Sequence, residues 1–212
     1  LESPDLTNGR TGVACGTSGG AFPAMEDMAR FIAEKDMVNL KGSTYPLLMP
    51  HSAAVNLSIF FGVTGMVIAT SVACASGSQA LCYGRDAILL GREDAMICCG
   101  AEEFSPFSAG VFDALFQTSP GTDPSKSPRP FDRSRDGIVV GEGAGSLLIE
   151  DWDHAMARGA VPLAEIAGAA SNSDAVHITS PDASGMERCM RMALDDAGLA
   201  PSDIGYVNGH GT

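Results

Sequence analysis

Residues 66–90, with the sequence MVIATSVACASGSQALCYGRDAILL, hold the pattern that decides the fold. Residues 66–70 are uncharged and rich in β-branched side chains, which is typical of a strand. Residues 75–90 are rich in Ala and Leu and are followed by Gly91, which predicts a helix. Because Cys74 lies between the two, we expect a strand that turns through a cysteine directly into a helix.

Strands and helices alternate along the chain on both sides of this stretch. Towards the N-terminus, a Gly-rich turn at residues 16–20 joins a short buried strand to a helix. Alternation of this kind favours an α/β layered fold with a mainly parallel sheet. The further predicted strands are residues 11–15, 94–99, 146–150, 163–169 and 204–207, the further helices are residues 51–62, 152–158, 186–197 and a segment through Met25, Met28, Ala29 and Ile32, and the predicted loops are residues 2–10 and 171–184.

The composition excludes several kinds of partner. The chain has 212 residues, of which 45% are hydrophobic and 18% charged, which is enough to bury a substantial core. Its formal net charge of -13 repels phosphate backbones, so we expect no nucleic acid partner. The apolar stretches end well short of the ~20 residues of a membrane span, and no cysteines have the CxxC spacing of a zinc site. We therefore expect no membrane contact, no metal and a reducing, cytoplasmic location.

Cys74 is the residue with the clearest chemical role. Backbone N–H groups at a helix N-terminus stabilise a thiolate and a developing oxyanion, and the small residues after Cys74 leave room for a substrate. This setting predicts a nucleophile. The alternative is a buried structural cysteine, which is the usual fate of this residue type. We expect that alternative for the other cysteines, which are Cys15, Cys82, Cys98, Cys99 and Cys189.

Four blocks, in order along the chain, carry a resemblance to one enzyme family. Val72-Ala73-Cys74-Ala75-Ser76-Gly77 is similar to the nucleophile motif of the β-ketoacyl-acyl carrier protein synthases, and Tyr206-Val207-Asn208-Gly209-His210-Gly211-Thr212 resembles their Asn-Ala-His-Gly-Thr loop. The separation between Cys74 and His210, 136 residues (210 − 74), also fits the family spacing. The other two blocks are Gly100-Ala101-Glu102-Glu103, and Arg129-Pro130-Phe131-Asp132 with the run from Arg135-Asp136-Gly137 to Gly145.

The resemblance implies a thiolase-like fold, which is layered α/β/α/β/α and has two similar halves, each with a mixed five-stranded sheet. Residues 1–160 would form most of the N-terminal half and residues 161–212 the beginning of the C-terminal half. In the family, a second catalytic histidine, a buried lysine and a Gly-Phe-Gly-Gly loop follow the His-Gly-Thr block, and a first strand precedes the part present here. We therefore expect a chain truncated at both ends, with an incomplete active site.

The resemblance also implies the reaction, a decarboxylative Claisen condensation that needs no cofactor. Cys74 would hold an acyl group as a thioester, and His210 would donate a hydrogen bond to the malonyl thioester carbonyl. Gly19 falls where some members place a bulky gate, so a glycine there predicts a deeper acyl pocket. Thr212 and Ser180 match residues that line the tunnel for the pantetheine arm. These motifs fit fatty acid and polyketide biosynthesis alike.

The implied partners are an acyl carrier protein and a second ketosynthase-like subunit. An acidic carrier would be repelled by the average charge of this chain, so docking would need a local basic patch. The patch available is Lys126, Arg129, Arg133 and Arg135, although a solvated loop explains the same cluster equally well. We expect a homodimer or heterodimer whose sheets join through residues 66–70, because an uncovered apolar edge strand would aggregate.

Two other functions are open on the sequence. Residues 16–20, GTSGG, satisfy the G-x-S-x-G elbow of α/β-hydrolases after a strand, so Ser18 is the candidate nucleophile of a serine esterase. The second alternative is a non-catalytic partner similar to a chain-length factor, a ketosynthase relative that shapes its partner's pocket. Such partners usually replace the nucleophile, so the presence of Cys74 favours an enzyme.

Overall fold

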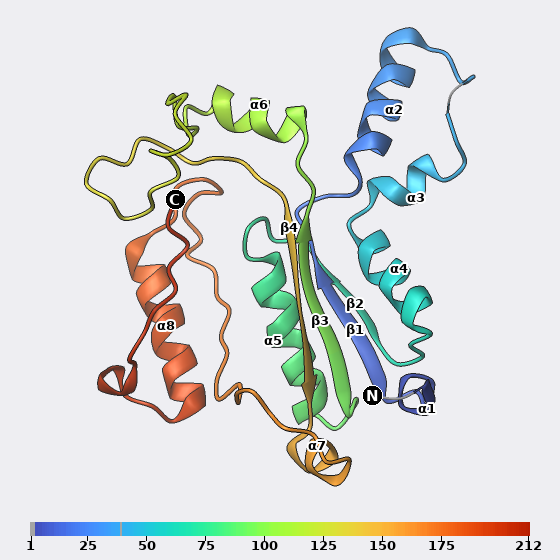
Figure 1. Cartoon of the computed structure of the whole chain (residues 1–212), viewed down its shortest axis with the longest axis vertical. Coiled ribbons are helices and arrows are strands. Elements are labelled where there is room, and N and C mark those ends of the chain that lie inside the picture. The colour runs from blue at the N-terminus through green and yellow to red at the C-terminus, as the bar shows by residue number, and fades with distance from the viewer. Residues whose placement is uncertain (1–2, 39) are drawn as a thin grey trace.

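The computed structural model describes residues 3–38 and 40–212, and one sheet runs through the centre of this part of the chain (Figure 1). Its strand order is β2-β1-β3-β4. Strands β2 and β3 pair parallel with β1, whereas β4 pairs antiparallel with β3, so the sheet is mixed. The strands are β1 (Thr11–Gly16), β2 (Val67–Thr70), β3 (Ala95–Glu102) and β4 (Gly143–Glu150), and all four were predicted.

Helices cover both faces of the sheet. Helix α5 (Ser76–Leu89) packs on one face and α4 (His51–Phe61) on the other (Figure 1). Alternate residues of β1 point to the two sides: Ala14 joins the apolar cluster beneath α5, whereas Val13 and Cys15 join the cluster beneath α4. The side-chain period of two therefore lets one strand supply both cores.

Glycines allow α5 to lie close against the sheet. A Cβ atom at Gly16 would lie 2.2 Å from the backbone of Ser76. Gly77 and Gly100 face each other so closely that a Cβ atom on Gly77 would lie 3.2 Å from the Gly100 Cα. These contacts fix the N-terminal end of α5, where Cys74 is carried, directly against β1 and β3.

The remaining helices surround this centre. Helices α6 (Pro106–Ala114) and α8 (Ala183–Ala197) begin at side-chain caps, in which Ser105 and Asp182 accept hydrogen bonds from backbone N–H groups. Gly198 ends α8 in the left-handed conformation, as its glycine predicts. The other elements are α1 (Ser3–Leu6), α2 (Phe22–Glu34), α3 (Thr44–Leu48), α7 (Trp152–Ala157) and the 3-10 helix η1 (Pro201–Asp203).

Three predictions of secondary structure are wrong. Residues 163–169 and 204–207 are not strands, because no strand of the described chain lies beside them and an unpaired segment gains no ladder hydrogen bonds. The predicted loop at residues 2–10 contains helix α1. That helix is held to the sheet by a 2.9 Å hydrogen bond from the Thr11 hydroxyl to the Asp5 carbonyl, which local sequence does not reveal.

Candidate active site

Cys74 lies on a tight turn between β2 and α5, as predicted. Strand β2 ends at Thr70, α5 begins at Ser76, and between them Ala73 adopts a left-handed backbone with a φ of 51°. A non-glycine residue in this region is strained, and strain of this kind concentrates at functional sites. The turn presents Cys74 on its outside, where the side chain is exposed.

Ser76 holds this turn in shape. Its hydroxyl donates to the Ala73 carbonyl at 2.6 Å and accepts the Val72 N–H at 2.8 Å. The Thr70 hydroxyl in turn donates to the Ser76 carbonyl at 2.7 Å. Because Ser76 is buried, these bonds are shielded from water, and the strained turn is fixed before a substrate arrives.

Exposure separates Cys74 from the cysteines of the core. Burial raises the pKa of the Cys15 thiol to about 11 and the pKa of the Cys98 thiol to about 12. Both thiols stay protonated near neutral pH, which leaves them unreactive. The interpretation as a buried structural cysteine therefore fits Cys15 and Cys98 and is wrong for Cys74.

The first turn of α5 offers backbone donors next to Cys74. The N–H groups of Gly77 and Ser78 find no acceptor among the described residues, because this helix start has no side-chain cap. Gly77 lines the same cavity as Cys74. A thiolate, or the oxyanion formed when it attacks a carbonyl, can accept hydrogen bonds from such groups.

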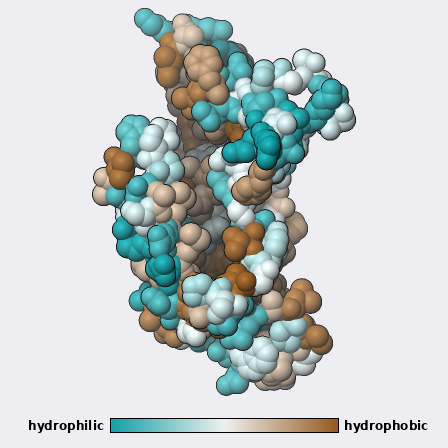
Figure 2. Space-filling view, turned by 90° about the vertical axis from the view of Figure 1, so that its left-hand side faces the viewer, coloured by the Kyte–Doolittle hydropathy of each residue, from teal (hydrophilic) through white to brown (hydrophobic). Residues whose placement is uncertain are grey.

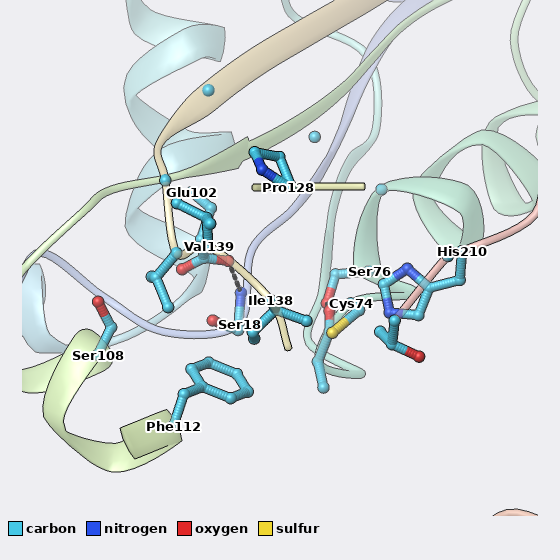
Figure 3. A pocket seen from close by; sticks show the side chains of 18 of the residues that line it. Ser18, Cys74, Ser76, Glu102, Ser108, Phe112, Pro128, Ile138, Val139 and His210 are labelled. Atoms are coloured by element: carbon cyan, nitrogen blue, oxygen red, sulfur yellow. Dashed lines mark hydrogen bonds between the residues drawn. The ribbon is translucent and has the colours of Figure 1, made fainter. Parts of the chain in front are cut away.

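Cys74 opens into a cavity of about 860 Å³ that gathers residues from distant parts of the chain. The Cys74 sulfur and the His210 ring lie next to each other in the view of Figure 3, and both line this cavity. Thr212 lines it too, so the structure brings Cys74, His210 and Thr212 together. Apolar side chains, among them Phe112 and Ile138, line other parts of the wall (Figure 3). Such a wall suits a hydrocarbon chain.

The other two predicted site residues lie elsewhere. Gly19 lines a second cavity of about 540 Å³, which shares part of its wall, including Glu102 and Glu103, with the first. The two cavities are therefore neighbours. Ser180 is exposed and lines neither of these cavities, so the structure does not bring it to Cys74.

The three glycines of the Gly-rich turn differ in what surrounds them, since Gly16 and Gly20 press against backbone atoms and Gly19 does not. A Cβ atom at Gly20 would lie 2.2 Å from the carbonyl carbon of Leu48, which is closer than any side chain permits. A Cβ atom at Gly19 would lie 3.3 Å from the Cε of Met25, which is the movable end of a flexible side chain. The backbone thus requires glycine at Gly20, whereas glycine at Gly19 leaves space that a larger residue would fill.

Two carboxylates that the sequence analysis did not assign to the site organise this turn. Glu102 accepts the Ser18 N–H at 2.9 Å, and Glu103 accepts the Phe22 N–H at 3.1 Å. They place negative charge beside a turn on which a serine hydrolase would need N–H donors for its oxyanion. This arrangement disfavours Ser18 as a nucleophile. The block Gly100-Ala101-Glu102-Glu103 was the only signal for these residues, and it does not say which N–H groups they bind.

The predicted basic patch is partly neutralised. Lys126 and Arg129 form ion pairs with nearby aspartates at 3.3 and 3.5 Å. Arg135 lines the cavity that contains Cys74 and donates to a backbone carbonyl at 2.9 Å. Of the four side chains of this patch, Arg133 and Arg135 form no ion pair with a described residue, so they carry the positive charge of the patch that is not offset.

Two other kinds of site are absent from the described part of the chain. No group of three or more His, Cys, Asp or Glu side chains is arranged there to bind a metal ion. None of its helices combines the length and the apolar character needed to cross a lipid bilayer. The six cysteines are free thiols.

Family models and curated relatives match this chain over nearly its whole length. The model described as "Beta-ketoacyl synthase, N-terminal domain" matches residues 1–155, and "Beta-ketoacyl synthase, C-terminal domain" matches residues 163–212. Nodulation protein E of Rhizobium leguminosarum bv. trifolii is 40% identical over 96% of this chain, and 3-oxoacyl-[acyl-carrier-protein] synthase 2 of Vibrio cholerae serotype O1 is 39% identical over 100% of it. The matches cover 50% and 52% of those proteins, so the chain spans about half the length of the curated relatives it matches.

Solved structures share the fold. A β-ketoacyl synthase from Burkholderia phymatum has a TM-score of 0.96 at 44% identity, over 100% of this chain and 52% of that one. A ketosynthase bound to the hexaketide, in complex with its type II PKS acyl-carrier protein, has a TM-score of 0.87 at 33% identity, over 100% of this chain and 54% of that one. The predicted thiolase-like, layered α/β fold is confirmed. The mixed sheet was predicted to have five strands, and the described residues form four of them.

Proposed function

Because the chain belongs to the β-ketoacyl synthase family, we propose that the whole protein is a β-ketoacyl-acyl carrier protein synthase that holds its acyl group on Cys74. The observation that carries the proposal is the position of Cys74, exposed on a strained turn and open to one cavity with His210. The names of the relatives do not favour a serine esterase. The presence of Cys74 argues against a non-catalytic partner.

The first half-reaction transfers an acyl group from its carrier to Cys74. The Cys74 sulfur attacks the thioester carbonyl and forms a new C–S bond, and the carrier's thiol leaves with the proton that Cys74 gave up. The unpaired N–H groups of Gly77 and Ser78 are donors for the oxyanion of the tetrahedral intermediate. Apolar wall residues such as Phe112 then pack against the acyl chain.

The second half-reaction lengthens the acyl group. Malonyl-carrier protein loses carbon dioxide, and the electron pair of the broken C–C bond passes into an enolate whose oxygen accepts a hydrogen bond from His210. The enolate carbon attacks the acyl-Cys74 thioester. A C–C bond forms, the C–S bond to Cys74 breaks, and the released Cys74 thiolate takes up a proton from solvent before the next cycle.

The acyl chain length depends, in this proposal, on the wall at Gly19. The two cavities are neighbours, and Gly19 has no side chain that would fill the space between the Gly-rich turn and the second cavity. We expect Gly19→Phe to lower acylation by long acyl chains at least about tenfold while short chains react as in the wild type. Rates with a series of acyl-carrier proteins of increasing length measure this, and equal losses at all lengths would contradict it.

The proposed partner is an acyl carrier protein, as in the solved ketosynthase complex with its acyl-carrier protein. Arg133 and Arg135 supply the free positive charge, and Arg135 lies in the wall of the cavity that contains Cys74. An acidic carrier surface would be attracted to this point despite the net charge of the chain. We place the reaction in the cytoplasm, where free thiols stay reduced.

The test supplies the whole protein with acyl-carrier protein and malonyl-carrier protein. We expect carbon dioxide and 3-oxoacyl-carrier protein, detected by mass spectrometry, and no 3-oxoacyl product from Cys74→Ala. Ser18→Ala should keep forming the product, because Ser18 has no covalent role. A product that survives Cys74→Ala but is lost in Ser18→Ala would contradict the proposal.

A further inference from the structure

The His210 ring is not fixed by any hydrogen bond within the described part of the chain. Among residues 3–38 and 40–212, no hydrogen bond to the imidazole is found. The backbone of residues 205–212 also makes no backbone hydrogen bond within this part of the chain. The position of the ring therefore depends on what packs against the loop that carries it.

Two glycines flank His210, and both press against one neighbouring turn. A Cβ atom at Gly209 would lie 2.9 Å from the Cζ of Phe131. A Cβ atom at Gly211 would lie 2.9 Å from the Cβ of Pro130 and 3.4 Å from the Cε2 of Phe131. The loop thus rests so closely on Pro130 and Phe131 that a side chain on either side of His210 would force the loop and this turn apart.

Phe131 occupies a backbone position that favours glycine. The Asp132 N–H donates to the Arg129 carbonyl at 3.2 Å, which closes a β-turn with Pro130 in its second position. The φ of Phe131, in the third position, is 66°. Proline followed by a positive φ is the signature of a type II turn, whose third position prefers glycine. Phe131 is therefore strained. It is 72% exposed in the described part of the chain, so no packing within that part offsets the strain.

We infer that Phe131 is a positioning residue, whose ring packs against the loop that carries His210 and holds that loop in place. The inference rests on the proposed function, in which His210 donates a hydrogen bond to the malonyl carbonyl. Hydrogen bonds weaken steeply when donor and acceptor are misaligned, so a displaced loop loses decarboxylation. Cys74 is held by Ser76 on a different turn, and its acylation does not depend on Phe131.

The variant Phe131→Gly separates this role from a merely structural one. Glycine relieves the strain of the turn, so the thermal unfolding temperature should hold or rise. Loss of the ring should lower carbon dioxide release from malonyl-carrier protein at least about tenfold in the whole protein. Acylation of Cys74 should stay within about twofold of the wild type, since that step does not use His210. Phe131→Tyr keeps the ring and should restore decarboxylation.

Phe116 provides a matched control. Its φ is 56° and its side chain is 94% exposed, so it shares the strained backbone and the exposure of Phe131. None of its atoms is among those nearest to a Cβ atom at Gly209 or Gly211. Phe116→Gly should therefore leave both half-reactions unchanged, and a Phe131→Gly variant that decarboxylates equally well would overturn the inference.

A second readout reports on the His210 ring without any chemistry. In histidine-labelled whole protein, the ring resonance of His210 is assigned by its loss in His210→Asn. Phe131→Gly should shift and broaden this resonance, whereas Phe116→Gly should not. A wild-type protein that neither acylates Cys74 nor decarboxylates malonyl-carrier protein refutes the proposed function. A resonance that Phe131→Gly leaves unchanged refutes the role of Phe131 instead.

Discussion

The cysteines of this chain differ in what surrounds them. Cys15 and Cys98 belong to the two apolar clusters of the core, and burial raises their pKa values to about 11 and about 12. Cys74 is exposed on a turn and lies beside the unpaired N–H groups that begin α5. The reactivity of a thiol depends on its exposure to the reactant and on nearby N–H donors that stabilise the thiolate. Among these three cysteines, only Cys74 has both.

We expect iodoacetamide to alkylate Cys74 first. Near neutral pH, Cys74 should react at least about tenfold faster than Cys15 or Cys98, because the buried thiols are both enclosed and protonated. Timed peptide mass mapping gives the rates, and the protein unfolded in denaturant is the control in which all thiols are accessible. Equal rates in the folded protein would mean that Cys74 is as enclosed as the core cysteines.

Local features of the site could be predicted from the sequence, and contacts between distant residues could not. The strand-to-helix turn at Cys74 follows from a β-prone run and a start of small residues, which are both local signals. No local signal places the Glu102 carboxylate on the Ser18 N–H, 84 residues away. Ser180 stays a prediction from the motif, since the described structure leaves it away from both cavities.

Among the secondary-structure elements, the strands predicted correctly are those that pair with another strand of the sheet. Strands β1 to β4 are apolar runs that pair with one another, and each appears within a few residues of its predicted position. Residues 163–169 and 204–207 have the same local pattern but no partner strand in the described chain, and pairing is a property of the sheet rather than of the segment. Helices α3 and α6 are short, so their periodicity is too weak to detect.

One side chain joins α5 to α8. The Arg85 guanidinium donates from Nε to the Ile166 carbonyl at 3.2 Å and from Nη2 to the Ala167 carbonyl at 3.1 Å. Its Nη1 lies 2.9 Å from the Asp196 carboxylate on α8. Because Arg85 is largely buried, this planar group ties α8 and the segment before it to the helix that begins beside Cys74.

We expect Arg85→Ala to loosen α8. The change leaves two carbonyls and a carboxylate without their charged donor, which should lower the free energy of unfolding by about 1–3 kcal/mol and speed hydrogen exchange in α8. Arg191→Ala is the matched control, because its 2.7 Å ion pair with Glu187 is exposed and stays within α8. That pair should contribute no more than about 0.5 kcal/mol. Equal effects of the two variants would contradict a linking role for Arg85.

This chain exposes more surface than a compact monomer of the same mass. Its accessible surface is 13889 Å², whereas a compact monomer of 21.8 kDa has about 9,200 Å². Figure 2 shows that the side that carries α8 is hollowed, with apolar residues in its depth. Leu163 and Ile178 are 100% and 96% exposed. Since the chain spans about half the length of its curated relatives, we expect the rest of the whole protein to cover this surface.

Strand β2 is an edge of the sheet with no strand on its outer side in the described residues. We expect the whole protein to dimerise through this edge, because pairing with a second copy would satisfy its free backbone groups. Ile68 packs against the core cluster that contains Ala14, so a charge there would damage folding, whereas Val67 is half exposed. Val67→Lys should therefore convert the dimer to a monomer and slow acylation of the nearby Cys74.

Light scattering on the whole protein measures the mass of the Val67→Lys variant. Leu89→Lys, an equally charged change at an exposed position of α5, is the control and should stay dimeric. A folded Val67→Lys protein with the wild-type mass and acylation rate would rule out pairing through β2.

The role of Cys74 is tested most directly by locating the acyl group after the whole protein has reacted with acyl-carrier protein alone. Peptide mass mapping should find the acyl mass on the peptide that contains Cys74. Hydroxylamine should release it, because it is a thioester, and Cys74→Ala should never acquire it. An acyl group on the peptide that contains Ser18, or consumption of acyl-carrier protein with no acyl mass on Cys74, would contradict the proposed function.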